Sequence, residues 1–290
     1  MLIIQAVVII ASLVTITAVV RNRTSGPDSR SAAPTATAAA AAAPSPFAPA
    51  TSPAGAVDPA ATAAPRTYGT ITITDQVLTG DPRLHIAVHY PAVSGLPDAA
   101  RQDRVNAQLR APADRALSGF AADFGQYPPE AGDNGFATVA NHVAATGKLL
   151  SVRFDTSMRF PGARSVNGGV TAVTVRLDTG DPIPASAMFT PAAKDDTGAK
   201  VLALALRNHF MTAGCADNPG FGDKAVAENI ADALRDKPGA AVLVVPNGLW
   251  FSFGPGSIAA DVCGIITGLL LFTDLTQFVD PALVALAGAY

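Results

Sequence analysis

Charged residues are scarce in this chain, and cysteine, tryptophan and glutamate are scarcer still. Of the 290 residues, 15% are charged, two are cysteine and one is tryptophan. Glutamate occurs only as Glu130 and Glu228. Two cysteines without a Cys-x-x-Cys spacing cannot form a zinc site by themselves, so such a site would also need histidine ligands. The net charge is +2 over residues 21–66 and −5 over residues 67–290, so the basic face of a nucleic-acid-binding domain is absent from the sequence.

Familiar catalytic motifs are also missing. The sequence contains no Gly-x-Ser-x-Gly, P-loop, Gly-x-Gly-x-x-Gly or His-Glu-x-x-His pattern. The carboxylate pairs Asp195–Asp196 and Asp178/Asp181 lie in turn or helix-start sequence, where aspartate is expected as a capping residue. We therefore expect no enzyme activity, no cofactor and no metal site. The high Ala, Gly and Pro content is typical of a high-GC genome.

Residues 1–20 form the longest apolar run, without a charged side chain. About 20 apolar residues span a bilayer core as a helix. The run is long for the apolar part of a signal peptide, and no small-x-small cleavage site precedes Arg21. We predict an uncleaved single-pass anchor with residues 67–290 outside the cytoplasm. The alternative is a cleaved signal sequence and a secreted protein. Arg21, Arg23 and Arg30 follow the run, which by the positive-inside rule favours the opposite orientation.

Residues 21–66 are rich in Ala, Pro, Ser and Thr, with seven prolines from Pro34 to Pro65. Such a composition cannot bury a core, and its prolines prevent a long helix. This segment is predicted to be a disordered linker between the membrane and the folded domain.

The stretch from Leu150 to Phe160 alternates apolar and polar residues, which is the pattern of a half-buried strand. Residues 171–177 alternate in the same way, and the intervening Pro and Gly residues supply a chain reversal. The sequence predicts a long antiparallel hairpin with one apolar face.

Further strands and helices are expected on both sides of this hairpin. Helical spacing or capping residues predict helices over 97–124, 197–211, 224–235 and 281–287, the first kinked or split at Pro112. In the second helix, Val201, Leu204, Ala205 and Phe210 are expected on the apolar side. Strands are predicted over 70–74, 83–90, 138–146, 241–245, 249–253 and 262–272, with Asn247-Gly248 as a hairpin turn. Residues 67–290 are thus predicted to be an α+β domain, with a mostly antiparallel sheet and two or three packed helices.

The histidines favour structural roles. In a strand, His85 and His89 would lie about 13 Å apart, too far to share a metal ion. They are interpreted as surface residues. His142 is predicted to be a strand residue with a hydrogen-bond partner rather than a catalyst.

Two motifs resemble a bacterial extracytoplasmic domain of uncharacterised type. The first is Phe160-Pro161-Gly162-Ala163-Arg164 with Leu177-Asp178-Thr179-Gly180-Asp181 and Phe189; the second runs from Gly248 to Ala259. The domain occurs in the lysozyme-responsive anti-sigma factor of Gram-positive bacteria, in a mycobacterial secreted immunogenic antigen and beside some peptidoglycan deacetylases. The likeness covers about residues 140–280. Arg164 stands where the family has His, and Gly256 where it tends to have Tyr.

The resemblance implies a binding or sensing module for a cell-wall glycan or a lysozyme-like protein. Arg159, Phe160 and Arg164 are the candidate contact residues. One alternative is an accessory domain of peptidoglycan processing. Another is a truncated anti-sigma factor, which would require a cytoplasmic segment before the membrane span.

An extracytoplasmic location also bears on Cys215 and Cys263. Outside the cell, a disulfide between them is the natural reading. It would close a loop of roughly 49 residues, worth about 4 kcal/mol on the chain-entropy model. The alternative is two buried, inert thiols.

Overall fold

The computed structural model describes residues 66–80, 85–125, 135–161, 163, 166–207, 209–210, 223–260 and 263–288. All of them belong to one compact unit, Ala54–Tyr290. The predicted anchor and nearly all of the predicted linker lie outside the described residues. Within the described part of the chain, no helix is both long enough and apolar enough to cross a membrane.

Among the described residues, the larger of two sheets has six strands in the order of the sequence. Its members are β1 (Arg66–Tyr68), β2 (Ile71–Thr79), β3 (Ile86–Ser94), β4 (Phe136–Thr146), β5 (Leu149–Arg159) and β6 (Asn167–Arg176). Neighbours are antiparallel except β3 and β4, which run parallel. A parallel pair needs a crossover, and α1 (Ala99–Gly125) supplies it. The predicted α+β class and mostly antiparallel sheet are confirmed.

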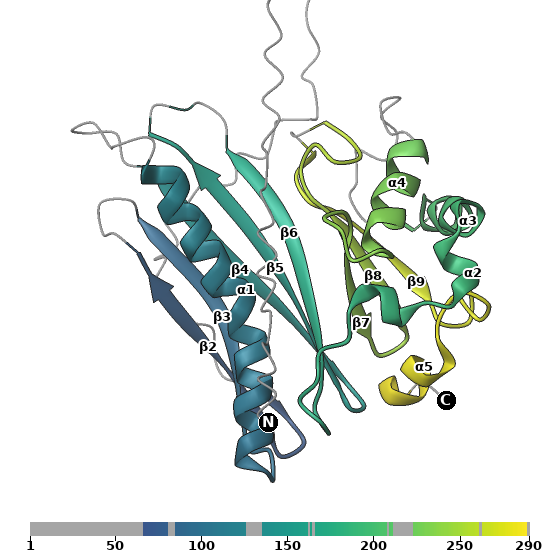
Figure 1. Cartoon of the computed structure of the whole chain (residues 1–290), viewed down its shortest axis with the longest axis horizontal. Helices are drawn as coiled ribbons and strands as arrows, with labels where there is room; N and C mark the ends of the chain where they lie inside the picture. The colour runs from purple at the N-terminus through teal and green to yellow at the C-terminus, as the bar shows by residue number, and fades with distance from the viewer. Residues whose placement is uncertain are drawn as a thin grey trace, which may run out of the picture. The chain divides into compact units, whose positions relative to one another are not determined.

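Helix α1 lies along one face of this sheet, as Figure 1 shows. Its buried side chains, which include Val105, Leu109 and Phe124, pack against Val88, Val152 and other strand residues. Asp98 Oδ1 accepts a hydrogen bond from the Arg101 amide at the start of the helix, as expected for an aspartate in that position. Pro112 does not split the helix, which is continuous over 27 residues.

The predicted hairpin is formed by β5 and β6, with Leu150 opposite Val175 and Val152 opposite Val173. One expectation about it was wrong. The polar face of β5 is not open to solvent along its first half, where Ser151 and Arg153 are buried. The reason is a second sheet packed on that face, which alternation within β5 alone does not reveal.

This second sheet contains β7 (Ala241–Val245), β8 (Gly248–Phe253) and β9 (Ile266–Leu271), in that order and all antiparallel. The predicted hairpin of β7 and β8 is confirmed, but its two-residue turn is Pro246-Asn247, and Gly248 is already the first residue of β8, paired with Val245. The sequence predicts a single sheet, and the structure corrects this, because β7, β8 and β9 form a separate one. Apolar side chains of β7 and β8 face a second core, formed with α3 (Asp196–Arg207), α4 (Asp223–Ala233) and α5 (Pro281–Ala287). Met188 and Phe189, predicted core residues, are buried in it. Met188 ends the short helix η2 (Ala185–Met188), and Phe189 follows it, before α2 (Pro191–Lys194) begins.

The buried side of α3 differs from the prediction. Leu202 and Leu206 point into the core, whereas Val201 is 42% exposed and Leu204 is 61% exposed. Apolar residues occur on both sides of this helix, so periodicity alone did not identify the buried one. The result is an exposed aliphatic pair on α3.

Helix α5 packs on the turn between β4 and β5. The Lys148 amide donates to the Leu286 carbonyl at 2.8 Å, and Thr146 Oγ1 donates to the Ala287 carbonyl at 2.8 Å. Gly147, between them, has a φ of 53°. The C-terminal helix thereby connects the second core to the first sheet.

Candidate functional site

A polar cluster lies where the two sheets meet. Arg153 Nε and Nη2 donate to the two carboxylate oxygens of Asp155 at 2.7 and 2.8 Å. Arg153 Nη1 donates to Ser252 Oγ at 3.1 Å, and the guanidinium carbon lies 5.8 Å from the centroid of the Trp250 ring. Since β5 carries Arg153 and β8 carries Ser252, the guanidinium joins the sheets.

His142 on β4 completes this cluster. Its Nε2 lies 2.9 Å from Asp155 Oδ2. Burial raises the pKa of Asp155, but the hydrogen bonds from His142 and Arg153 outweigh burial, so the carboxyl titrates below its ordinary value of 3.8. His142 is thus a strand residue with a partner, as predicted. In this arrangement the carboxylate is already held by Arg153 and His142, and it orients the guanidinium that joins the two sheets.

Two hydroxyl groups extend the contact between the sheets. Ser151 Oγ lies 2.7 Å from Thr174 Oγ1 and accepts a hydrogen bond from the Val244 amide at 3.1 Å. Strand β7 is at the edge of its sheet, so Ser151 satisfies an amide that would otherwise be buried without a partner. The buried polar residues of β5 therefore have a structural explanation.

The remaining histidines occupy different settings. His85 precedes β3 with a φ of 45°, so it does not share a strand with His89 as assumed. His89 Nδ1 lies 2.7 Å from Asp75 Oδ2, and Asn141 Nδ2 donates to Asp75 Oδ1 at 2.7 Å. No group of three or more His, Cys, Asp or Glu side chains arranged to hold a metal occurs among the described residues.

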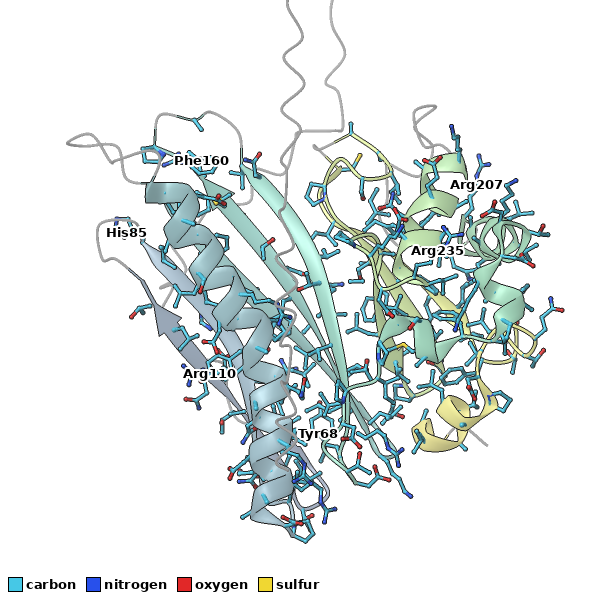
Figure 2. All side chains as sticks on the ribbon, viewed as in Figure 1. Tyr68, His85, Arg110, Phe160, Arg207 and Arg235 are labelled. Carbon is cyan, nitrogen blue, oxygen red and sulfur yellow. The ribbon has the colours of Figure 1, made fainter. Side chains whose placement is uncertain are left out.

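Two of the predicted contact residues pack within the domain. The Arg159 guanidinium carbon lies 5.5 Å from the centroid of the Phe136 ring. The Phe160 ring meets Phe124 of α1 edge-on, with 5.5 Å between centroids, and Figure 2 shows Phe160 near the last turn of that helix. Arg164 lies outside the described residues, so a contact role for the three stays a prediction.

The cysteine prediction is also open. Cys263 lies between β8 and β9 in the sequence, and its side chain is buried in the second core. Cys215 lies outside the described residues. The disulfide stays a prediction.

A candidate site for ligand binding is a groove between α3 and α4, with a volume of about 830 Å³. That volume is in the range of small-molecule and peptide sites. Ala199, Ala227, Ala231 and Leu204 provide its apolar lining. Because alanine side chains are small, a ligand can approach the backbones of both helices. The exposed Leu204, whose neighbour on the helix is Val201, lies at one wall.

Charges of both signs surround this groove in equal number. The acidic residues are Asp196, Glu228 and Asp232, and the basic ones are Lys200, Lys224 and Arg235. Arg235 Nη2 lies 3.3 Å from Asp196 Oδ1, and Lys224 Nζ lies 3.7 Å from Glu228 Oε1. Figure 2 shows Arg235 beside α3 and α4. The site is not predicted from the sequence, because the helical spacing places Leu204 on the buried side of α3, whereas the structure exposes it.

Comparisons with known proteins yield a structural likeness only. No protein-family model matches the sequence, and no curated protein matches it. A DUF3298 family protein of Bacteroides fragilis has a similar structure, with a TM-score of 0.46 and 12% identity over 74% of this chain and 98% of the other. A DUF3298 family protein of Pseudomonas aeruginosa gives a TM-score of 0.42 and 14% identity over 73% and 93%. The predicted links to the anti-sigma factor, the antigen and the deacetylases stay predictions. These two similar structures are both bacterial proteins of the DUF3298 family.

Proposed function

We propose that this protein is an extracytoplasmic binding or sensing module rather than an enzyme. It is held at the cell membrane by residues 1–20, or secreted after their removal. The observation that carries the proposal is the open groove between α3 and α4, which combines ligand-sized volume with an exposed leucine and paired charges. The polar cluster around Asp155 has a structural role, because its donors and acceptors bind each other and join the two sheets.

The ligand class follows from the resemblance in the sequence. That resemblance implies a cell-wall component or a lysozyme-like protein. The test measures binding of the full-length protein, purified in detergent under oxidising conditions, to lysozyme and to purified peptidoglycan fragments. Saturable binding to either one supports the proposal. Absence of binding to both contradicts the proposed ligand class.

A matched pair of variants assigns the binding to the groove. Leu204→Ser removes the exposed aliphatic side chain of the groove wall, and Val201→Ser makes the same kind of change on the same helix outside the groove lining. Neither side chain is buried, so both variants should fold. Weaker binding by Leu204→Ser alone places the ligand at the groove. Equal binding by both variants shows that the ligand lies elsewhere.

A further inference from the structure

The charges on the groove restrict what it can bind. Three acidic and three basic residues line it, so its formal charge is zero. A polyanion or a polycation would gain attraction at some of these positions and lose as much at the others. A ligand with charges of one sign therefore has no electrostatic advantage here.

Two of these charges have no ion-pair partner within the described part of the chain. Asp196 pairs with Arg235, and Lys224 pairs with Glu228. That leaves Lys200 on α3 and Asp232 on α4, which make no ion pair with another described residue. A cation and an anion are thus both available at one groove, contributed by opposite walls.

The apolar part of the lining adds a third element. Leu204 follows Lys200 by one helical turn, so both side chains lie on the same side of α3. Leu204 is 61% exposed, and Ala199, Ala227 and Ala231 are too small to cover it. An aliphatic side chain of a ligand would bury Leu204, which is favourable in proportion to the area removed from water.

From this arrangement we propose that the groove recognises a peptide segment carrying an acidic, a basic and an aliphatic side chain. The acidic group of the peptide pairs with Lys200, the basic group with Asp232, and the aliphatic group packs on Leu204. This inference rests on the proposed binding function and names the chemistry of its ligand.

The test uses capped peptides of roughly six residues, long enough to extend about 20 Å. One contains Glu, Lys and Leu, and its companions replace Lys by Glu, Glu by Lys, or Leu by Ser. Binding to the full-length protein is measured by fluorescence anisotropy at low salt, where exposed charges are least screened. We expect the mixed peptide to bind about fivefold tighter than each companion, since an exposed ion pair contributes up to about 1 kcal/mol.

A charge-reversal variant makes the assignment specific. Lys200→Glu should weaken the mixed peptide and strengthen the peptide in which Lys replaces Glu. Arg115→Glu, on an exposed residue of α1 outside the groove lining, is the control and should change neither. If Lys200→Glu and Arg115→Glu behave alike, or if the four peptides bind equally or not at all, the inference is wrong.

The outcome is separable from that of the proposed function. Binding of lysozyme or wall fragments with no dependence on peptide charge would leave the binding role intact and reject the peptide. Self-association of the protein that Leu204→Ser abolishes, measured by analytical ultracentrifugation, would instead assign the groove to a second copy of this chain and overturn the inference.

Discussion

At the scale of single residues, Arg153 and Arg176 form similar ion pairs in different environments. Each donates from Nε and Nη2 to an aspartate two positions further along the chain. Arg153 has a side chain only 10% exposed, and it also contacts Ser252 and Trp250 of the second sheet. Arg176 is 34% exposed. The two arginines therefore form a natural test pair.

We predict that Arg153→Ala lowers the free energy of unfolding by about 3 kcal/mol, because it leaves a largely buried carboxylate without its guanidinium partner and Ser252 without its donor. Arg176→Ala should cost far less, since water screens that pair. Urea denaturation of both variants measures the difference. Equal losses would show that Arg153 does not join the two sheets energetically.

Asp155 gives a prediction about pH. Its pKa is lower in the folded protein than the ordinary value of 3.8, so the unfolded chain binds its proton more readily. The stabilisation is therefore present above pH 4 and is lost as pH falls through the folded pKa. The stability difference between the wild type and Asp155→Asn should be large at pH 7 and shrink towards pH 3. A difference that stays constant would contradict the ion-paired state.

At the scale of elements, the turn between β4 and β5 depends on the C-terminal helix. Gly147 has a φ of 53°, and a Cβ placed there would collide with the backbone of Leu286 and Ala287 in α5. Gly69, in the turn between β1 and β2, has a φ of 62° but open space around a Cβ. Both glycines have the left-handed backbone conformation, but only Gly147 is in contact with α5.

Gly69→Ala should therefore cost about 1 kcal/mol of stability from the left-handed backbone conformation. Gly147→Ala should cost more than about 2 kcal/mol, because α5 must also move. Thermal or urea denaturation measures both. If the two variants lose the same amount, α5 does not pack on the turn.

Local elements were predictable, but their assembly was not. The hairpin of β5 and β6 follows from strict alternation, and Pro246-Asn247-Gly248 marks the hairpin of β7 and β8. Both signals act over a few residues. The parallel pairing of β3 and β4, and the packing of the second sheet on the first, arise from contacts distant in sequence. The buried Ser151 and Arg153 look like solvent-facing residues until β7 and β8 are placed over them.

The candidate site was missed for a related reason. Helix α3 has aliphatic residues on two sides, and only the packing of α4 and β9 decides that Leu202 and Leu206 are buried while Leu204 is not. The charges that line the groove come from two helices, and no local motif relates them. The predicted contact residues Arg159 and Phe160 pack on neighbouring rings, and their contact role stays a prediction.

At the scale of the whole molecule, location and cysteine chemistry are linked. An extracytoplasmic domain permits the Cys215–Cys263 disulfide, and a cytoplasmic one does not favour it. We predict no free thiol on the denatured, non-reduced protein isolated from its native compartment. Thiol labelling followed by intact-mass spectrometry measures this. Two labelled cysteines would contradict both the disulfide and the argument for location that uses it.

The central claim is that α3 and α4 form the ligand-binding surface. Hydrogen-exchange mass spectrometry of the full-length protein tests it most directly, with lysozyme, peptidoglycan fragments or the mixed-charge peptide added in turn. The account predicts slower exchange on ligand addition in residues 199–207 and 224–233. Protection confined to the β5 end near Phe160, or to any surface away from these two helices, would contradict it.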